Sequence, residues 1–152
     1  MRKRGQRIKH RETGSMPFAA LRPLPAADRV RVGLEHHTAL DSLLQGRGSD
    51  RDMGVIAEAL NVATALAEDG VGSEGLALFE SAQSLAVETC VRSREIGQWE
   101  IGDGAKKVIA DALNLHDEQL AIATLRDLKQ AFAKIRKLKQ KGAFIDAHAT
   151  TH

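Results

Sequence analysis

Residues 50–68 read DRDMGVIAEALNVATALAE, and this stretch decides the fold class. Its apolar residues recur at three- and four-residue spacing, which is the period of one face of an α-helix. Other aliphatic residues lie beside that face, so the predicted helix is apolar around much of its circumference and should be the most buried element of the protein. The face consists of Met53, Ile56, Leu60, Ala63 and Ala67, and it is widened by Val55, Val62 and Leu66.

A second helix is predicted before this stretch. It should begin near Pro25, because proline suits the first helical turn, and it should end at Gly46. The loop at residues 46–50 leads into the central helix, which Asp50 can cap. Spacing predicts an apolar face on the earlier helix, with His37 part-buried and His36 at the surface. That face consists of Val30, Leu34, His37, Leu40 and Leu44.

A third helix should begin at a Ser73 cap and extend through Cys90. The glycine-rich residues 70–75 before it are predicted to be a turn between helices, because the acidic residues around them would repel a phosphate. Gly97 and Gly102 then interrupt the helical period. Residues 94–102 are therefore expected to form a loop or a short extended piece, with Trp99 inserted into the core.

The remaining sequence predicts two further helices. Asp103 can cap one that ends at Asn114, since asparagine tolerates the left-handed conformation of helix ends. Asp117 can cap a long last helix that runs to Gly142. The expected fold is all-α, an antiparallel bundle of four to five helices. We divide the chain into a basic flexible arm (1–24), a helical bundle domain (25–141) and a C-terminal tail (142–152).

Composition restricts the function classes. Cys90 is the single cysteine, and no run of 18 apolar residues occurs, which predicts a cytoplasmic protein without a membrane span. His37 and Asp41 lie four residues apart, but two ligands do not make a metal site. Cys90 has no neighbouring base in the sequence, and no nucleophile or phosphate-loop motif is present. We therefore predict no enzyme activity, no cofactor and no metal.

Charge is distributed very unevenly. Residues 1–12 carry a net charge of +5 and residues 126–141 a net charge of +6, whereas residues 13–125 carry −8. Basic ends of this kind neutralise phosphates, so they are the candidate nucleic-acid-binding residues. The candidates are Arg2, Lys3, Arg4, Arg7, Lys9, Arg11, Lys134, Arg136, Lys137, Lys139 and Lys141. Arg126 and Lys129 are expected on the same solvated side of the last helix.

Residues 109–120 also have the apolar skeleton of a helix-turn-helix motif. Its recognition helix would begin with Asp117 and Glu118, which would place two carboxylates against a duplex. The helix after Asp117 is also too long for a compact motif. An ordinary helical hairpin at this point is the preferred interpretation.

The order of sequence features resembles a group of short, mostly uncharacterised bacterial and prophage-associated helical proteins, some of them labelled Fis-type regulators. The features are the basic arm, His37 with Leu40 and Leu44, then LNVA at 60–63, GQW at 97–99 and LHDEQL at 115–120. The resemblance implies an accessory protein of a mobile element, and it assigns no functional residues. In a Fis-type protein the C-terminal helix-turn-helix is basic, whereas here it is acidic.

These observations predict a non-enzymatic helical protein that binds nucleic acid or a nucleoprotein partner. Its few aromatic residues favour duplex or structured nucleic acid over single strands. The alternative is a protein-interaction module, such as an oligomeric adaptor or an inhibitor, that binds no nucleic acid. In that case the wide apolar face at 53–67 and the apolar residues 17–21 would form the interface. A homo-oligomer is compatible with either function.

Overall fold

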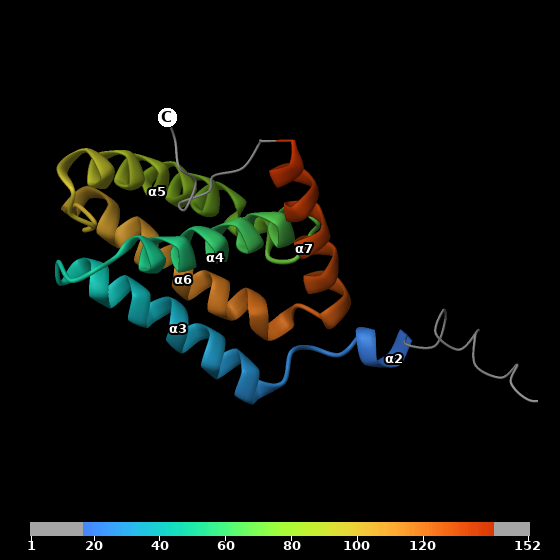
Figure 1. Ribbon diagram of the computed structural model, residues 1–152. Helices are drawn as coiled ribbons and strands as arrows, with labels where there is room; N and C mark the ends of the chain where they lie inside the picture. Colours follow the sequence, from blue (N-terminus) through green and yellow to red (C-terminus); the bar gives the residue numbers. More distant parts are fainter. Residues whose placement is uncertain (1–16, 142–152) are drawn as a thin grey trace, which may run out of the picture.

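The computed structural model describes residues 17–141, and these form an all-α bundle without a β-strand (Figure 1). The predicted fold class is therefore confirmed. A short helix and a single 3₁₀ turn accompany five long helices. In chain order the elements are α2 (Pro17–Ala20), α3 (Ala26–Leu44), α4 (Asp50–Glu68), the 3₁₀ turn η1 (Ser73–Gly75), α5 (Leu76–Ile96), α6 (Asp103–Ile122) and α7 (Leu125–Gln140).

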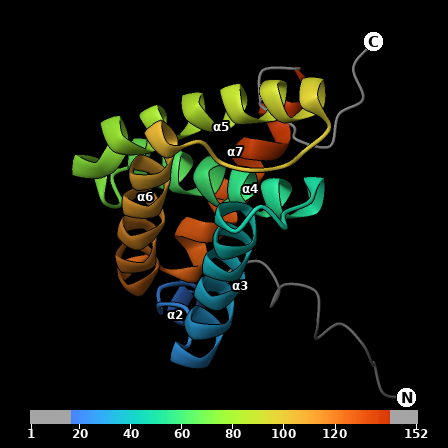
Figure 2. The ribbon, with the colours of Figure 1, turned by 90° about the vertical axis from the view of Figure 1, so that its left-hand side faces the viewer.

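Helix α4 lies at the centre of the bundle and packs against each of α3, α5, α6 and α7. In both ribbon views α5 lies on one side of α4 and α3 on the other (Figure 1, Figure 2). Thirteen of its 19 residues are buried, including the polar Asn61 and Thr64. The Thr64 hydroxyl donates to the carbonyl of Leu60 at 2.8 Å, so its burial leaves no donor unpaired. The prediction of α4 as the most buried element is confirmed.

The core is divided into two clusters that share α4. The larger core cluster joins α3, α4, α5 and α6, with Leu43, Ile56, Leu60, Phe79 and Ile109 fully buried. The smaller core cluster joins α4 and the end of α6 to α7. It consists of Val62, Ala65, Leu66, Leu120, Ala123, Leu128, Ala131 and Ile135.

The predicted apolar face of the first long helix is displaced by about one residue from the face that is buried in the structure. Val30 and Leu34 are 69% and 65% exposed, and Leu44 is exposed as well. The prediction that His37 is part-buried is confirmed, but the prediction of His36 at the surface is wrong, because His36 is buried. The buried side of α3 presents small residues and a histidine, and spacing of aliphatic residues does not find such a face. It consists of Gly33, His36, Ala39, Leu40 and Leu43.

The predicted break at Asn114 is also wrong, because α6 continues through it to Ile122. Asn114 lies exposed on the helix, where asparagine costs only a fraction of a kcal/mol. The break falls at Ala123–Thr124, where Thr124 and Asp127 form a reciprocal capping box at the start of α7. Residues 109–120 therefore contain neither a helix-turn-helix nor a hairpin.

Three other helix starts differ in detail from the predicted caps. The cap of α4 is Ser49, which forms a capping box with Asp52, while Asp50 is the first helical residue. Ser73 lies in η1, and α5 begins at Leu76 without a side-chain cap. Gly102 precedes α6, so Asp103 is its first residue rather than its cap. In each case the predicted position is correct to within three residues.

The predicted loop between the third and fourth helices is confirmed in part. Helix α5 continues three residues into it and ends at Ile96, and Gly97 caps it in the left-handed conformation with a φ of 75°. Trp99 is half-buried and packs on the edge of the larger core cluster, so it does not fill the core. The guanidinium carbon of Arg94 lies 5.9 Å from the centre of its ring.

Residues 22–24 are bound to the start of α7. The backbone N–H of Leu125 donates to the carbonyl of Arg22 at 2.9 Å, and Pro23 pairs with Thr124 in an isolated bridge. Leu24 packs on the smaller core cluster. The end of the segment that we predicted as an arm is thus attached to the bundle beside α7.

Candidate functional site

Packing and capping determine which side of α7 faces the bundle. Leu128, Ala131 and Ile135 are buried against the end of α4, and the capping box at Thr124 sets where the helix begins. Figure 1 shows α7 crossing the end of the bundle at which α4 terminates. The opposite side of α7 must therefore face solvent.

That outward side of α7 is basic. Arg126, Lys129, Arg136 and Lys137 are all exposed. At 100° per residue they occupy an arc of about 100°, and the 11 residue steps from the first to the last span about 16 Å. Within residues 17–141 no ion pair joins any of the four to an acidic side chain. We call these four residues the α7 basic face.

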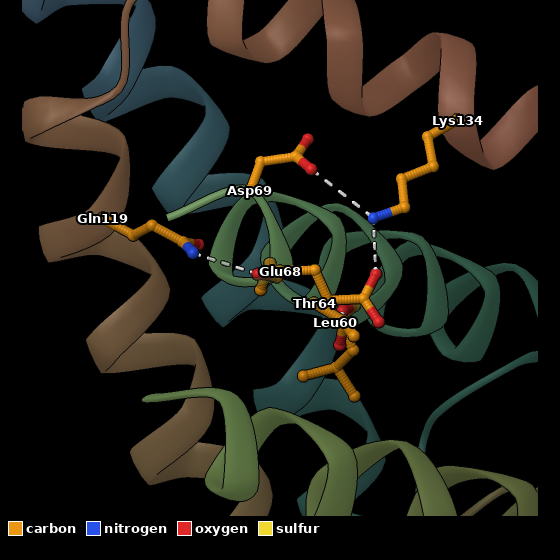
Figure 3. A network of polar contacts seen from close by, with 7 residues as sticks. Leu60, Thr64, Glu68, Asp69, Gln119 and Lys134 are labelled. Carbon is orange, nitrogen blue, oxygen red and sulfur yellow. Dashed lines mark hydrogen bonds and ion pairs between the residues drawn. The ribbon is translucent and has the colours of Figure 1, made fainter. Parts of the chain in front are cut away.

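Lys134, which the sequence placed among the candidates, has an internal role instead. Its Nζ lies 2.7 Å from Glu68 Oε1 and 3.6 Å from Asp69 Oδ1, both at the end of α4 (Figure 3). The hydrogen bond to Glu68 raises the pKa of Lys134. Two carboxylates at a helix C-terminus are unfavourable for the helix dipole, and the lysine offsets that effect.

The other candidates fall into two groups. Lys139 and Lys141 are exposed at the end of α7 and extend its positive charge. The predicted arm residues Arg2, Lys3, Arg4, Arg7, Lys9 and Arg11 lie outside the described residues. The described part of the candidate interface is therefore the α7 basic face with Lys139 and Lys141.

A second feature is a pair of stacked histidines beneath α7, which sequence reasoning missed. The rings of His36 on α3 and His116 on α6 are 5.6 Å apart and inclined by 24°. His116 is 1% exposed, and burial lowers its pKa to about 4. Burial also lowers the pKa of His36. Both rings are consequently neutral at pH 7.

Gln119 determines the tautomer of His116. Its amide nitrogen donates to the carbonyls of Ala63 at 3.0 Å and Val71 at 2.9 Å, so its oxygen is directed toward the histidine. Figure 3 shows Gln119 reaching from α6 toward α4. The Nδ1 of His116 lies 2.7 Å from that oxygen and must be the protonated nitrogen. His116 Nε2 is therefore a hydrogen-bond acceptor.

The stacked histidines line a pocket of about 340 Å³ that opens between α3, α4, α6 and α7. Apart from the histidines its walls are mainly aliphatic, and two exposed glutamates, Glu35 and Glu58, also line it. The apolar lining consists of Leu24, Val32, Val55, Ala59, Val62, Leu120, Leu128 and Phe132. The pocket therefore lies beside α7, which contributes Leu128 and Phe132 to its wall.

The residues that we considered for metal binding or catalysis are arranged differently from the sequence pattern. His37 pairs with Asp117 of α6, with Nε2 and Oδ2 2.7 Å apart, and not with Asp41. Asp41 accepts hydrogen bonds from Gln45 instead. Among residues 17–141, no three His, Cys, Asp or Glu side chains are placed to share a metal ion. Cys90 is 4% exposed, and burial raises the pKa of its thiol.

None of the helices in the described range 17–141 has the length and apolar character that a membrane span requires. No protein-family model, curated protein or solved structure matches this chain. The resemblance to short prophage-associated proteins thus stays a prediction from the sequence.

Proposed function

We propose that this chain is a non-enzymatic helical binding protein that contacts the backbone of duplex or structured nucleic acid through α7 and the N-terminal arm. The observation that carries the proposal is the α7 basic face, four cations on one side of a helix that form no ion pair within residues 17–141. A role as a regulator or as an accessory protein of a mobile element would fit such binding. Residues 13–125 carry a net negative charge, so the positive ends would orient the protein on a polyanion.

The contrast between Lys134 and its neighbours supports a role outside the bundle for the α7 basic face. Lys134 stabilises the fold by reaching Glu68 and Asp69, whereas the four face residues contact no acidic side chain among residues 17–141. Four like charges along about 16 Å repel one another, which costs stability. Release of counterions from phosphates would offset that repulsion on binding. Phosphate contacts give affinity rather than sequence preference.

The test is fluorescence anisotropy with a labelled DNA duplex and a structured RNA, titrated at several salt concentrations. The full chain is compared with the double variant Arg136→Gln/Lys137→Gln and with a chain that starts at Ser15. The matched control is Lys106→Gln/Lys107→Gln, which removes two exposed charges from α6. The α7 variant should reduce the slope of log K against log salt by about 2, at about 0.9 per lost phosphate contact.

The control should retain the slope of the unaltered chain. Equal slopes for the two double variants would refute a role for the α7 basic face. If binding is lost only when the arm is deleted, the interface lies in residues 1–14 and not on α7.

A protein-interaction module is the second candidate, and one observation favours it. Val30 and Leu34 expose aliphatic surface beside a shallow groove between α3 and α6. Exposed apolar residues that lie together are typical of protein contacts. Light scattering with and without Leu34→Glu distinguishes the two functions. If the protein forms a dimer that Leu34→Glu dissociates, and if it binds neither nucleic acid, the interaction module is supported and our first proposal is contradicted.

A further inference from the structure

One of the two histidine rings that line the pocket beneath α7 carries a buried nitrogen that has no hydrogen-bond partner within residues 17–141. His36 is 9% exposed, and its buried Nδ1 meets no hydrogen-bond partner in the described part of the chain. Such a nitrogen destabilises the folded protein unless something bonds to it. The stacked ring of His116 also lines the pocket, and its Nε2 is an acceptor.

We propose that this pocket binds a small apolar molecule that carries a neutral hydrogen-bond donor, such as a hydroxyl group on an aromatic ring. The donor would bond to the imidazole nitrogens, and the ring would lie against the aliphatic walls. A largely apolar cavity with a few directed polar groups is the usual form of a small-molecule site. The proposal concerns a site distinct from the α7 basic face and does not depend on nucleic-acid binding.

The volume of the pocket suggests the size of the ligand. A closed apolar cavity of about 150 Å³ holds one benzene. The pocket has a volume of about 340 Å³, and part of this volume lies at its mouth. We therefore expect it to accommodate no more than two fused rings. Leu128 and Phe132 of α7 provide one wall, so the ligand would be covered by the helix that carries the basic face.

The charges around the pocket exclude one class of ligand. Glu35 and Glu58 line it and are exposed, which disfavours a carboxylate or phosphate nearby. Both imidazoles are neutral and provide no compensating positive charge. A neutral donor is therefore preferred to a fatty acid or to another apolar anion.

Three probes of similar size test the proposal by ligand-observed NMR titration of the full chain. They are 2-naphthol, which carries a donor, 2-methylnaphthalene, which has none, and 2-naphthoate, which is an anion. We expect 2-naphthol to bind roughly two- to tenfold more tightly than 2-methylnaphthalene, the contribution of one hydrogen bond. We expect 2-naphthoate to bind the most weakly.

Two variants locate the binding. His36→Phe keeps an aromatic ring but removes the nitrogen, so it should bring the affinity for 2-naphthol down to that for 2-methylnaphthalene. Ala59→Leu should fill the pocket and abolish binding of both. The matched control is Ala77→Leu, the same substitution at an exposed position of α5 outside the pocket.

Failure to bind any probe would overturn the proposal, as would equal affinities for 2-naphthol and 2-methylnaphthalene. Binding of 2-naphthol that His36→Phe leaves unchanged would also overturn it. The comparison of the three probes uses the unaltered protein, so it decides the question even if a variant fails to fold.

Discussion

Burial of His116 predicts that the protein loses stability as the pH falls from 7.5 to 5. The pKa of His116 is about 4 in the folded protein and about 6.5 in an unfolded chain. Because the folded-state pKa is lowered, the unfolded chain binds a proton first, and each step below pH 6.5 favours unfolding. The loss levels off below pH 4, where both states are protonated.

The size of the effect follows from these two pKa values. At pH 5 the unfolded chain is almost fully protonated at this histidine, whereas the folded protein is about one-tenth protonated. The linkage relation then gives a loss of about 2 kcal/mol relative to pH 7.5. This is a large part of a total stability of about 5–15 kcal/mol. The lowered pKa of His36 acts in the same direction.

Urea unfolding at pH 7.5 and at pH 5, with the unaltered chain and with His116→Asn, measures the effect. Asparagine places an amide nitrogen near the position of Nδ1 and can still donate to Gln119, but it does not titrate. The difference between the two proteins isolates the contribution of His116 from that of every other group. If His116→Asn loses as much stability as the unaltered chain over this pH range, the claim that His116 is buried in its neutral form is refuted.

Two further predictions concern the fold. Gln119→Leu should destabilise the protein by about 2–4 kcal/mol, because it removes the bonds to Ala63, Val71 and His116 and leaves buried groups unpaired. The exposed control Gln130→Leu should change the free energy of unfolding by less than about 0.5 kcal/mol. Equal effects of the two substitutions in urea titrations would contradict the hydrogen-bond network of Gln119. Thr124→Ala should cost about 1 kcal/mol through loss of the α7 cap, whereas Asn114→Ala should stabilise the exposed interior of α6 by about half a kcal/mol. Thermal unfolding of both variants checks this pair, and destabilisation by Asn114→Ala would indicate that the helix ends there.

The fold class and the central helix could be predicted because they depend on period and composition. Helix α4 is apolar around most of its circumference, and only burial among other helices accommodates such a sequence. Gly46, Gly70 and Gly97 likewise mark turns in which a positive φ is required. These signals are local, so they are present in the sequence itself.

The errors arise where tertiary contacts decide between local alternatives. Asp117 is a good helix cap by residue type, but in the structure it pairs with His37, 80 residues earlier. Thr124 and Asp127 provide an equally good cap seven residues farther along, and the packing of Ala123 into the smaller core cluster selects it.

The histidine pocket could not be predicted for the same reason. His36 and His116 come from helices far apart in the sequence, and nothing local indicates that they stack. A histidine that is followed directly by an aspartate and three residues later by a glutamine, as at His116, is an ordinary surface pattern. The sequence does show the unusual pair His36-His37, but the spacing of aliphatic residues predicts His36 at the surface, whereas it is buried.

The position of α4 in both core clusters has a consequence for folding cooperativity. Ile56 and Leu60 belong to the larger core cluster, while Val62 and Leu66 belong to the smaller one, so α4 connects the two core clusters. Neither cluster can melt without exposing part of α4. Its amide protons should therefore exchange with solvent only when the whole bundle opens, at the free energy of global unfolding. Residues 17–141 should consequently unfold in one step, as a single cooperative unit.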